Sequence, residues 1–213
     1  MRIAASLRPF PGETTCGDVV AWWREGDTAL IAVADGLGHG LPARLAAESF
    51  MAAVEDNPGL DLAELMRRAD RSIVHTRGVA ATLVRVDLRA RTARIAGIGN
   101  VQGALFGERT RRFDGAAGIV GAGVRNVRPL DLSIGPEDVL ALWTDGLRHV
   151  DLDEASRHVR AAPQQLAERL LARFGCESDD CAVLCVAFDG AAPCAPTPFA
   201  PGSGPPEPCE PGS

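Results

Sequence analysis

The chain has 213 residues, 46% of them hydrophobic, and a formal net charge of −6. This length and composition suit one well-cored globular domain. The negative charge disfavours nucleic acid or an anionic membrane as a partner, because the general electrostatic term would be repulsive. There is no apolar run of about 18 residues and no recognisable signal peptide, so we expect no membrane association and a cytoplasmic protein.

The apolar runs predict nine strands, near residues 2–7, 18–24, 28–34, 80–87, 92–98, 101–107, 127–132, 138–144 and 181–188. Links as short as Glu25-Gly26-Asp27 can join only antiparallel neighbours, because a parallel pair needs a long crossover. The sheet structure is therefore expected to be largely antiparallel.

Helical periodicity predicts three helices and a weaker fourth, at Leu41 to Glu55, Asp61 to Val74, Pro163 to Phe174 and, for the weaker one, Asp153 to Arg160. Strands occur in groups and helices in pairs, without βαβ alternation. This pattern predicts an α+β fold in which helices cover the outer faces of antiparallel sheets. We expect one domain over residues 1–189. Residues 190–213 are rich in Pro, Ala and Gly and are expected to form a flexible tail.

The six cysteines show no paired C-x-x-C spacing; they are Cys16, Cys176, Cys181, Cys185, Cys194 and Cys209. A zinc site or a disulfide framework is therefore not expected, and in a cytoplasmic protein the thiols should be reduced.

Acidic residues at the tips of apolar strands are the most informative feature of the chain. The run 29–34 leads directly into Asp35-Gly36-Leu37-Gly38-His39-Gly40, where glycines leave the backbone open to a cation or a phosphate. The arrangement recurs at Asp145-Gly146 and at Asp179-Asp180, and Gly17-Asp18 is a fourth candidate. Clustered carboxylates are costly to bury without cations, so this pattern suits hard divalent ions with oxygen ligands.

Plainer interpretations exist for each of these motifs. Asp35 could cap the following helix, although Pro42 places the cap nearer Gly40 or Leu41. A dinucleotide loop is disfavoured, because the spacing is G-x-G-x-G and a carboxylate precedes it. Taken alone, Asp145-Gly146 could be an ordinary turn and Asp179-Asp180 a solvated loop. For each motif this plain interpretation is about as good as a role in a metal site.

The order of these motifs resembles the type 2C (PPM) superfamily of metal-dependent protein phosphatases, over roughly residues 2 to 188. Within it the chain is most similar to the SpoIIE-type branch and its RsbX-like stress-signalling members. The segments that carry the resemblance are Gly17-Asp18, Ala34 to Gly40, Thr76-Arg77-Gly78, Gly99-Asn100-Val101, Gly118 to Gly121, Thr144-Asp145-Gly146 and Ser178-Asp179-Asp180.

The resemblance implies an α-β-β-α sandwich and hydrolysis of phosphoserine or phosphothreonine with two Mn²⁺ or Mg²⁺ ions. The implied catalytic acids are metal ligands: Asp18, Asp35, Asp145 and Asp179, with the Gly36 carbonyl. Asp35 would bridge both ions, Gly36 and Asp18 would hold one of them, Asp18 partly through water, and Asp145 and Asp179 would hold the other. Asp180 would be an orienting neighbour.

The chain departs from the family pattern in three places. Ala21 stands where larger SpoIIE-type members carry a second acid. Leu37 replaces the histidine that follows the Asp-Gly pair in the broader superfamily, and His39 lies two residues later. The phosphate-binding arginine is not found before Asp18, which leaves Arg8 and Arg77 as substitutes to test.

The resemblance implies a phosphorylated STAS-domain protein as substrate and partner. The oligomeric state is left open, with a monomer favoured. The alternative is a phosphatase-like module that binds STAS or kinase partners without turnover. A nucleotide-binding switch is opposed by the absence of any lysine for a P-loop.

Overall fold

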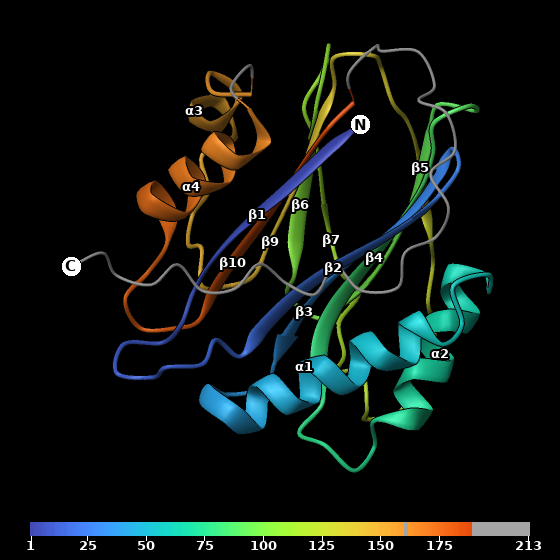
Figure 1. The fold of residues 1–213 in the computed structure, drawn as a ribbon, viewed down its shortest axis with the longest axis vertical. Helices are drawn as coiled ribbons and strands as arrows, with labels where there is room; N and C mark the ends of the chain where they lie inside the picture. The colour runs from blue at the N-terminus through green and yellow to red at the C-terminus, as the bar shows by residue number, and fades with distance from the viewer. Residues whose placement is uncertain (160–161, 189–213) are drawn as a thin grey trace.

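Two antiparallel sheets packed face to face form the centre of the computed structural model, which describes residues 1–159 and 162–188 (Figure 1). The first sheet has the order β1 (Arg2–Arg8), β10 (Cys181–Ala187), β9 (Val139–Trp143), β6 (Gln102–Phe106), β7 (Arg111–Asp114). The second has the order β2 (Asp18–Glu25), β3 (Thr28–Gly36), β4 (Val79–Asp87), β5 (Thr92–Ile98), β8 (Leu130–Ser133).

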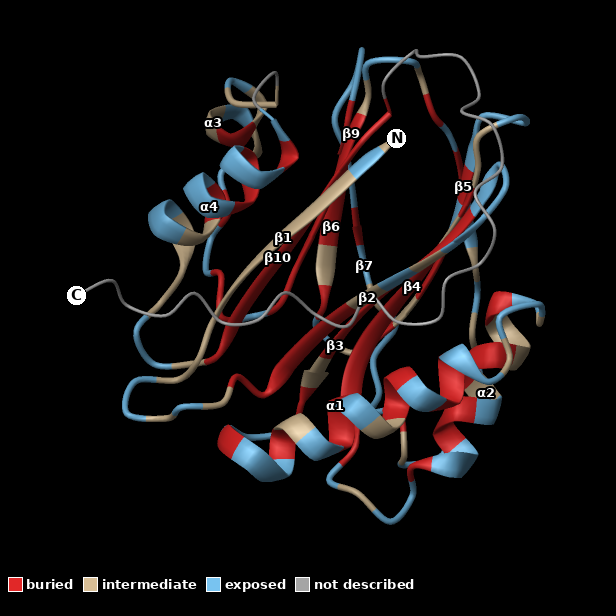
Figure 2. Cartoon of the chain, in the orientation of Figure 1, coloured by how far each residue is buried: buried red, intermediate tan, exposed pale blue. Residues whose placement is uncertain are grey.

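The central strands are apolar because both of their faces are covered. All seven residues of β10 and all five of β9 are buried, and Figure 2 shows these strands red along their length. One face of each sheet contributes to the core between the sheets, and the other packs under helices. Two-sided burial explains why these strands are nearly continuous hydrophobic runs and do not alternate with polar residues.

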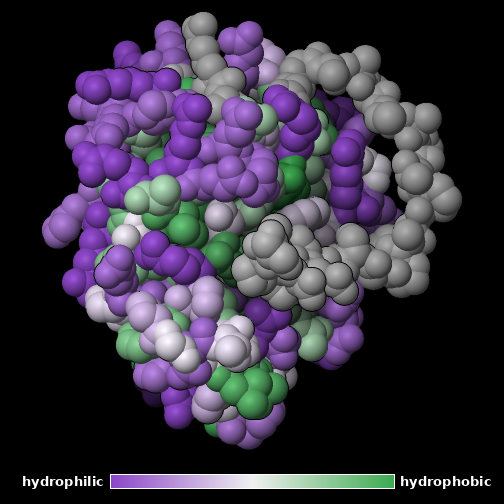
Figure 3. Space-filling view, turned by 60° about the vertical axis from the view of Figure 1, so that its left-hand side comes forward, coloured by the Kyte–Doolittle hydropathy of each residue, from purple (hydrophilic) through white to green (hydrophobic). Residues whose placement is uncertain are grey.

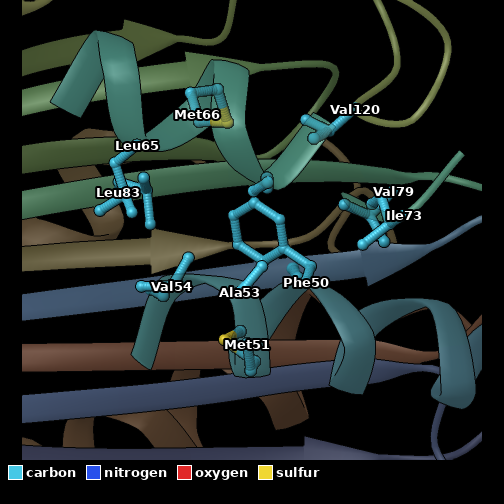
Figure 4. Packing of buried hydrophobic residues seen from close by; sticks show 14 of the residues in the cluster. Phe50, Met51, Ala53, Val54, Leu65, Met66, Ile73, Val79, Leu83 and Val120 are labelled. Atoms are coloured by element: carbon cyan, nitrogen blue, oxygen red, sulfur yellow. The ribbon is translucent and has the colours of Figure 1, made fainter. Parts of the chain in front are cut away.

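Each sheet has its own pair of helices on its outer face. The helices α1 (Gly40–Glu55) and α2 (Leu62–Ser72) cover the second sheet, while α3 (Leu152–Ser156) and α4 (Pro163–Phe174) lie on the side of the first (Figure 1). Phe50 of α1 lies among Met66 of α2, Ile73 and Val120, and all four side chains are fully or almost fully buried (Figure 4). This packing fixes α1, and with it the glycine loop that precedes it, against β3.

The contact between α1 and the end of β3 requires a glycine. A Cβ at Gly36 would fall on the carbonyl oxygen of Ala43, so the backbones of strand and helix approach too closely for any side chain. Gly38 has a φ of +91°, which an L side chain rarely adopts. The glycines after Asp35 are therefore needed to turn the chain from strand into helix.

The α+β fold expected from the sequence is confirmed, with small differences at the boundaries. The strand β7 was not predicted, and α3 ends at Ser156, earlier than expected. The N-cap of α1 is His39, one residue before the expected position.

The four cysteines of the described part are free thiols, whereas Cys194, Cys209 and the expected tail at 190–213 lie outside the described residues.

No helix within the described ranges combines the length and apolar character needed to cross a membrane.

Replacing Gly36 with Ala should lower the free energy of unfolding by about 1–3 kcal/mol, because the new methyl group has to displace α1 from β3. Urea denaturation followed by circular dichroism measures this change. Gly59→Ala is the matched control, since nothing lies within 4 Å of its Cβ position. Equal stability of the two variants would contradict the close approach.

Candidate metal centre between the sheets

The register of the second sheet brings two acids together. Asp18 begins β2 and Asp35 lies near the end of β3, and they are direct partners across the antiparallel pair. Val20 and Val33, two residues inward on each strand, belong to the core between the sheets. Because side chains alternate along a strand, Asp18 and Asp35 also face the first sheet.

The first sheet contributes its acids at the same end. Trp143 ends β9 opposite Val183 of β10, and the Thr144 N–H donates to the Ala182 carbonyl at 3.1 Å. The chain therefore leaves β9 into Asp145 at the point where Asp179 leads into β10. Four widely separated acids thus lie at one end of the sandwich.

Thr144 links the two sheets at this end. Its buried hydroxyl donates to Asp18 Oδ2 at 2.7 Å and accepts from the Ala182 N–H at 2.9 Å. The bond from Thr144 to Asp18 is made to a buried carboxylate, where a charge-assisted hydrogen bond is at its strongest. In the sequence, Thr144 was noted only as part of the motif Thr144-Asp145-Gly146 and was given no role. The one signal for a role was its position directly before Asp145.

Asn100 is a second residue whose role was missed. It follows β5 of the second sheet, and its Nδ2 donates to Asp145 Oδ2 at 2.6 Å. Asn100 lies in the link from β5 of the second sheet to β6 of the first, so Asp145 is held by the chain where it crosses between the sheets. The motif Gly99-Asn100-Val101 was the only signal of this residue in the sequence.

The acids raise one another's pKa. Burial, followed by the charges of Asp18, Asp145 and Asp179, raises the pKa of Asp35 to about 9. Burial also raises the pKa of Asp18 to about 7, against the Thr144 hydrogen bond, which lowers it. The pKa of Asp179 is raised by burial and by the charge of Asp145. Within the described residues none of these four acids forms an ion pair with a basic side chain.

Asp180, for which the resemblance implies an orienting role, lies between Asp179 and the start of β10. It is 3% exposed, and its Oδ1 accepts the Phe10 N–H at 2.8 Å. Its Oδ2 has no hydrogen-bond partner, and a Cβ at Gly17 would lie 2.7 Å from that atom. A buried carboxylate oxygen without a partner is costly, and a cation or an ordered water nearby would compensate it.

The donor set fits divalent cations. All of the groups are oxygens, the acids repel one another, and no basic side chain of the described residues forms an ion pair with them, which is the environment that Mg²⁺ or Mn²⁺ would stabilise. Among the described residues, however, no three Asp, Glu, His or Cys side chains are gathered as the ligands of one ion. The division of Asp18, Asp35, Gly36, Asp145 and Asp179 between two metal positions therefore stays a prediction.

His39 does not lie among the acids. Its Nδ1 is 3.0 Å from Glu13 Oε1, and its ring stacks on Phe10 with 4.4 Å between ring centroids. His39 therefore joins the glycine loop to the segment between β1 and β2. Leu37 stands where the broader superfamily has a histidine, but its hydrocarbon side chain cannot transfer a proton. Its backbone N–H donates to the Gly78 carbonyl at 3.1 Å.

This arrangement defines a class of protein. Two antiparallel sheets flanked by helices, with acids gathered between the sheets at one end, form the fold of the type 2C (PPM) protein phosphatases, and solved members of that class match the chain. The chain belongs to the SpoIIE family, because the family model described as stage II sporulation protein E (SpoIIE) matches residues 25–189. The resemblance seen in the sequence is thereby confirmed.

Three relatives illustrate the similarity. Phosphoserine phosphatase RsbX of Bacillus subtilis (strain 168) is 26% identical over 91 residues, which is 43% of this chain and 46% of RsbX. The matched region thus spans about half the length of this curated relative. A solved structure from the bacterial stressosome, described as a modular system adapted to control secondary messenger signaling, is 27% identical, with a TM-score of 0.80 over 86% of this chain and 97% of the other.

The third is a crystal structure of RsbX in complex with magnesium. It has a TM-score of 0.76, is 19% identical, and the match covers 86% of this chain and 92% of RsbX. At this identity the likeness shows the fold alone.

Thr144→Val should lower the free energy of unfolding by about 1–3 kcal/mol, because it leaves a buried Asp18 oxygen and the Ala182 N–H without their partner. Urea denaturation checks this. Thr92→Val at the exposed start of β5 removes a hydroxyl of the same kind and should change stability little. A neutral Thr144→Val variant would show that the hydroxyl does not stabilise the site.

The stability of the metal-free protein should fall as the pH rises. The unfolded chain loses its Asp protons near the ordinary pKa of 3.8, whereas the folded protein retains them on Asp18 and Asp35 up to about 7 and about 9. Over this window the folded state binds more protons, so the free energy of unfolding decreases with increasing pH. Asp35→Asn should make the decrease shallower in urea denaturation with EDTA at several pH values. Parallel pH curves for the two proteins would contradict the raised pKa.

Proposed function

We propose that this protein is a metal-dependent phosphatase that hydrolyses phosphoserine or phosphothreonine in another protein. The observation that carries the proposal is the set of four mutually repelling acids at one end of the sandwich, in a chain of the SpoIIE family. The phosphoserine phosphatase RsbX is a relative with the same fold.

Each residue has a proposed role. Two Mn²⁺ or Mg²⁺ ions, when bound, would activate a water for attack on phosphorus and neutralise the developing charge. Asp35 would contact both ions, Asp18 and the Gly36 carbonyl would hold one, and Asp145 and Asp179 would hold the other. Thr144 favours the ionised form of Asp18 through its hydrogen bond, and Asn100 orients Asp145.

The proposed substrate is a phosphorylated STAS-domain protein of a cytoplasmic stress-signalling cascade. The stressosome structure at 27% identity supports this assignment. A protein substrate is also supported by the surface beside the acids, since Leu41 and Leu45 at the start of α1 are 59% and 52% exposed. Figure 3 shows that one face of the molecule carries a hydrophobic patch near its bottom.

A module that binds STAS or kinase partners without turnover is the second candidate. The observation in its favour is that no three acidic, His or Cys side chains of the described residues are gathered around one point. Against it, a binding module has no need to keep an acidic cluster that is costly to bury.

Asp35→Asn should abolish metal-dependent hydrolysis of p-nitrophenyl phosphate. Loss of groups that only orient metal ligands commonly costs about 10–100-fold, so loss of a shared ligand should exceed about 100-fold. The assay compares Mn²⁺, Mg²⁺ and EDTA, and Asp131→Asn is the control, since Asp131 is an exposed residue of the edge strand β8.

A phosphorylated STAS-domain protein is the second substrate, with phosphate loss followed on a phosphate-affinity gel. Metal-dependent loss that Asp35→Asn abolishes supports the phosphatase. If folded wild-type protein binds the phosphoprotein but hydrolyses neither substrate with either metal, the phosphatase proposal is wrong and the binding module is supported.

A further inference from the structure

A site made of acids needs a basic side chain to receive a phosphate dianion. The four acids repel the substrate's phosphoryl group, and bound metal ions would offset only part of that repulsion. Arginine is suited to this task, because its planar fork can bind two phosphate oxygens at once. Among the described residues, three arginines lie around the site: Arg8, Arg77 and Arg148.

The guanidinium of Arg8 is already hydrogen-bonded to other groups of the protein. Its Nη2 donates to the Cys176 carbonyl at 2.6 Å and to Cys181 Sγ at 3.4 Å. A Cβ at Gly175 would lie 2.8 Å from the same nitrogen, so the guanidinium is enclosed by the segment that leads into β10. Arg8 therefore holds this segment in place.

Arg77 lies over the glycine loop. Its Nη1 is 2.7 Å from the position of a Cβ at Gly38, and the residue is exposed. It makes no hydrogen bond or ion pair with the described residues. Its neighbour is Gly38, three residues beyond Asp35.

Arg148 is placed beside the acids by backbone hydrogen bonds. Its N–H donates to the Phe174 carbonyl at 3.1 Å, and the Cys176 N–H donates to the Gly146 carbonyl at 2.8 Å. These bonds join the turn after Asp145 to the segment that carries Asp179. The position of Arg148 is therefore fixed by the same turn that places two of the proposed metal ligands.

The guanidinium of Arg148 has a single hydrogen-bond partner among the described residues. Its Nη2 donates to Ser178 Oγ at 3.2 Å, a neutral hydroxyl, and no ion pair joins it to the described residues. The side chain is exposed. The remaining N–H donors of the fork are free to bind an anion at the mouth of the site.

We propose that Arg148 binds the phosphoryl group of the substrate on the Asp145–Asp179 side of the site, with Ser178 steadying its guanidinium. This inference rests on the proposed function and names the residue that replaces the missing phosphate-binding arginine. Arg148 contacts the transferred group and is not a metal ligand.

The test measures phosphate binding separately from turnover. Inorganic phosphate is titrated into the Mn²⁺-loaded protein by calorimetry, and kcat, KM and phosphate inhibition are measured with p-nitrophenyl phosphate. Arg148→Ala should weaken phosphate binding and raise KM about tenfold or more, because charge-assisted hydrogen bonds are lost. Arg148→Lys should lie between it and wild type, since lysine keeps the charge but not the fork. Mn²⁺ affinity should be unchanged or tighter.

Arg109→Ala is the matched control for the loss of one positive charge. Arg109 is exposed in the hairpin between β6 and β7, at the far end of the sheet from Asp145. The proposal is overturned if Arg148→Ala stays within twofold of this control, or if Arg77→Ala has the larger effect on phosphate binding. Thermal unfolding of each variant verifies that it is folded.

The two proposals fail in different ways. Normal hydrolysis by Arg148→Ala, with unchanged phosphate binding, overturns the role of Arg148 and leaves the phosphatase standing. Arg148-dependent phosphate binding by a wild-type protein that hydrolyses neither substrate supports the role of Arg148 and overturns the phosphatase.

Discussion

The burial of two acids, Asp18 and Asp35, which are paired across β2 and β3, is the constraint on which the rest of the site depends. Their register fixes both carboxylates between the sheets, where burial, followed by the charges of neighbouring acids, raises their pKa values. The chain opposes this cost with the Thr144 hydroxyl, but with no ion pair in the described part of the protein. A fold that holds acids with raised pKa values at a solvent-accessible end, without basic partners among the described residues, is suited to binding cations and an anionic substrate there.

The surrounding architecture holds the acids at this end. The close approach of α1 to Gly36 fixes the glycine loop, and the bonds between the Gly146 and Cys176 segments fix the other two acids. Both sheets contribute, since Thr144 at the end of β9 in the first sheet bonds to Asp18 of β2 in the second. The site is thus a property of the sandwich, and neither sheet could form it alone.

Much of the fold could be predicted from the sequence because its signals are local. Two-sided burial makes β9 and β10 continuous apolar runs, short polar links require antiparallel pairing, and Pro163 and Gly175 bound α4. The strand β7 escaped prediction because its four residues, Arg111–Asp114, contain a single buried side chain. So short a segment is defined by its pairing with β6 and not by its own pattern.

The sequence by itself determined the fold class, the family and the acids at the strand tips, because these follow from local periodicity and ordered motifs. Only the tertiary structure decided which residues serve those acids. It placed Thr144 and Asn100 in contact with the acids and paired His39 with Glu13. It also bound Arg8 to the Cys176 carbonyl and left Arg148 available to bind an anion. Those partners are set by hydrogen bonds between residues far apart in the chain, and no local pattern encodes such contacts.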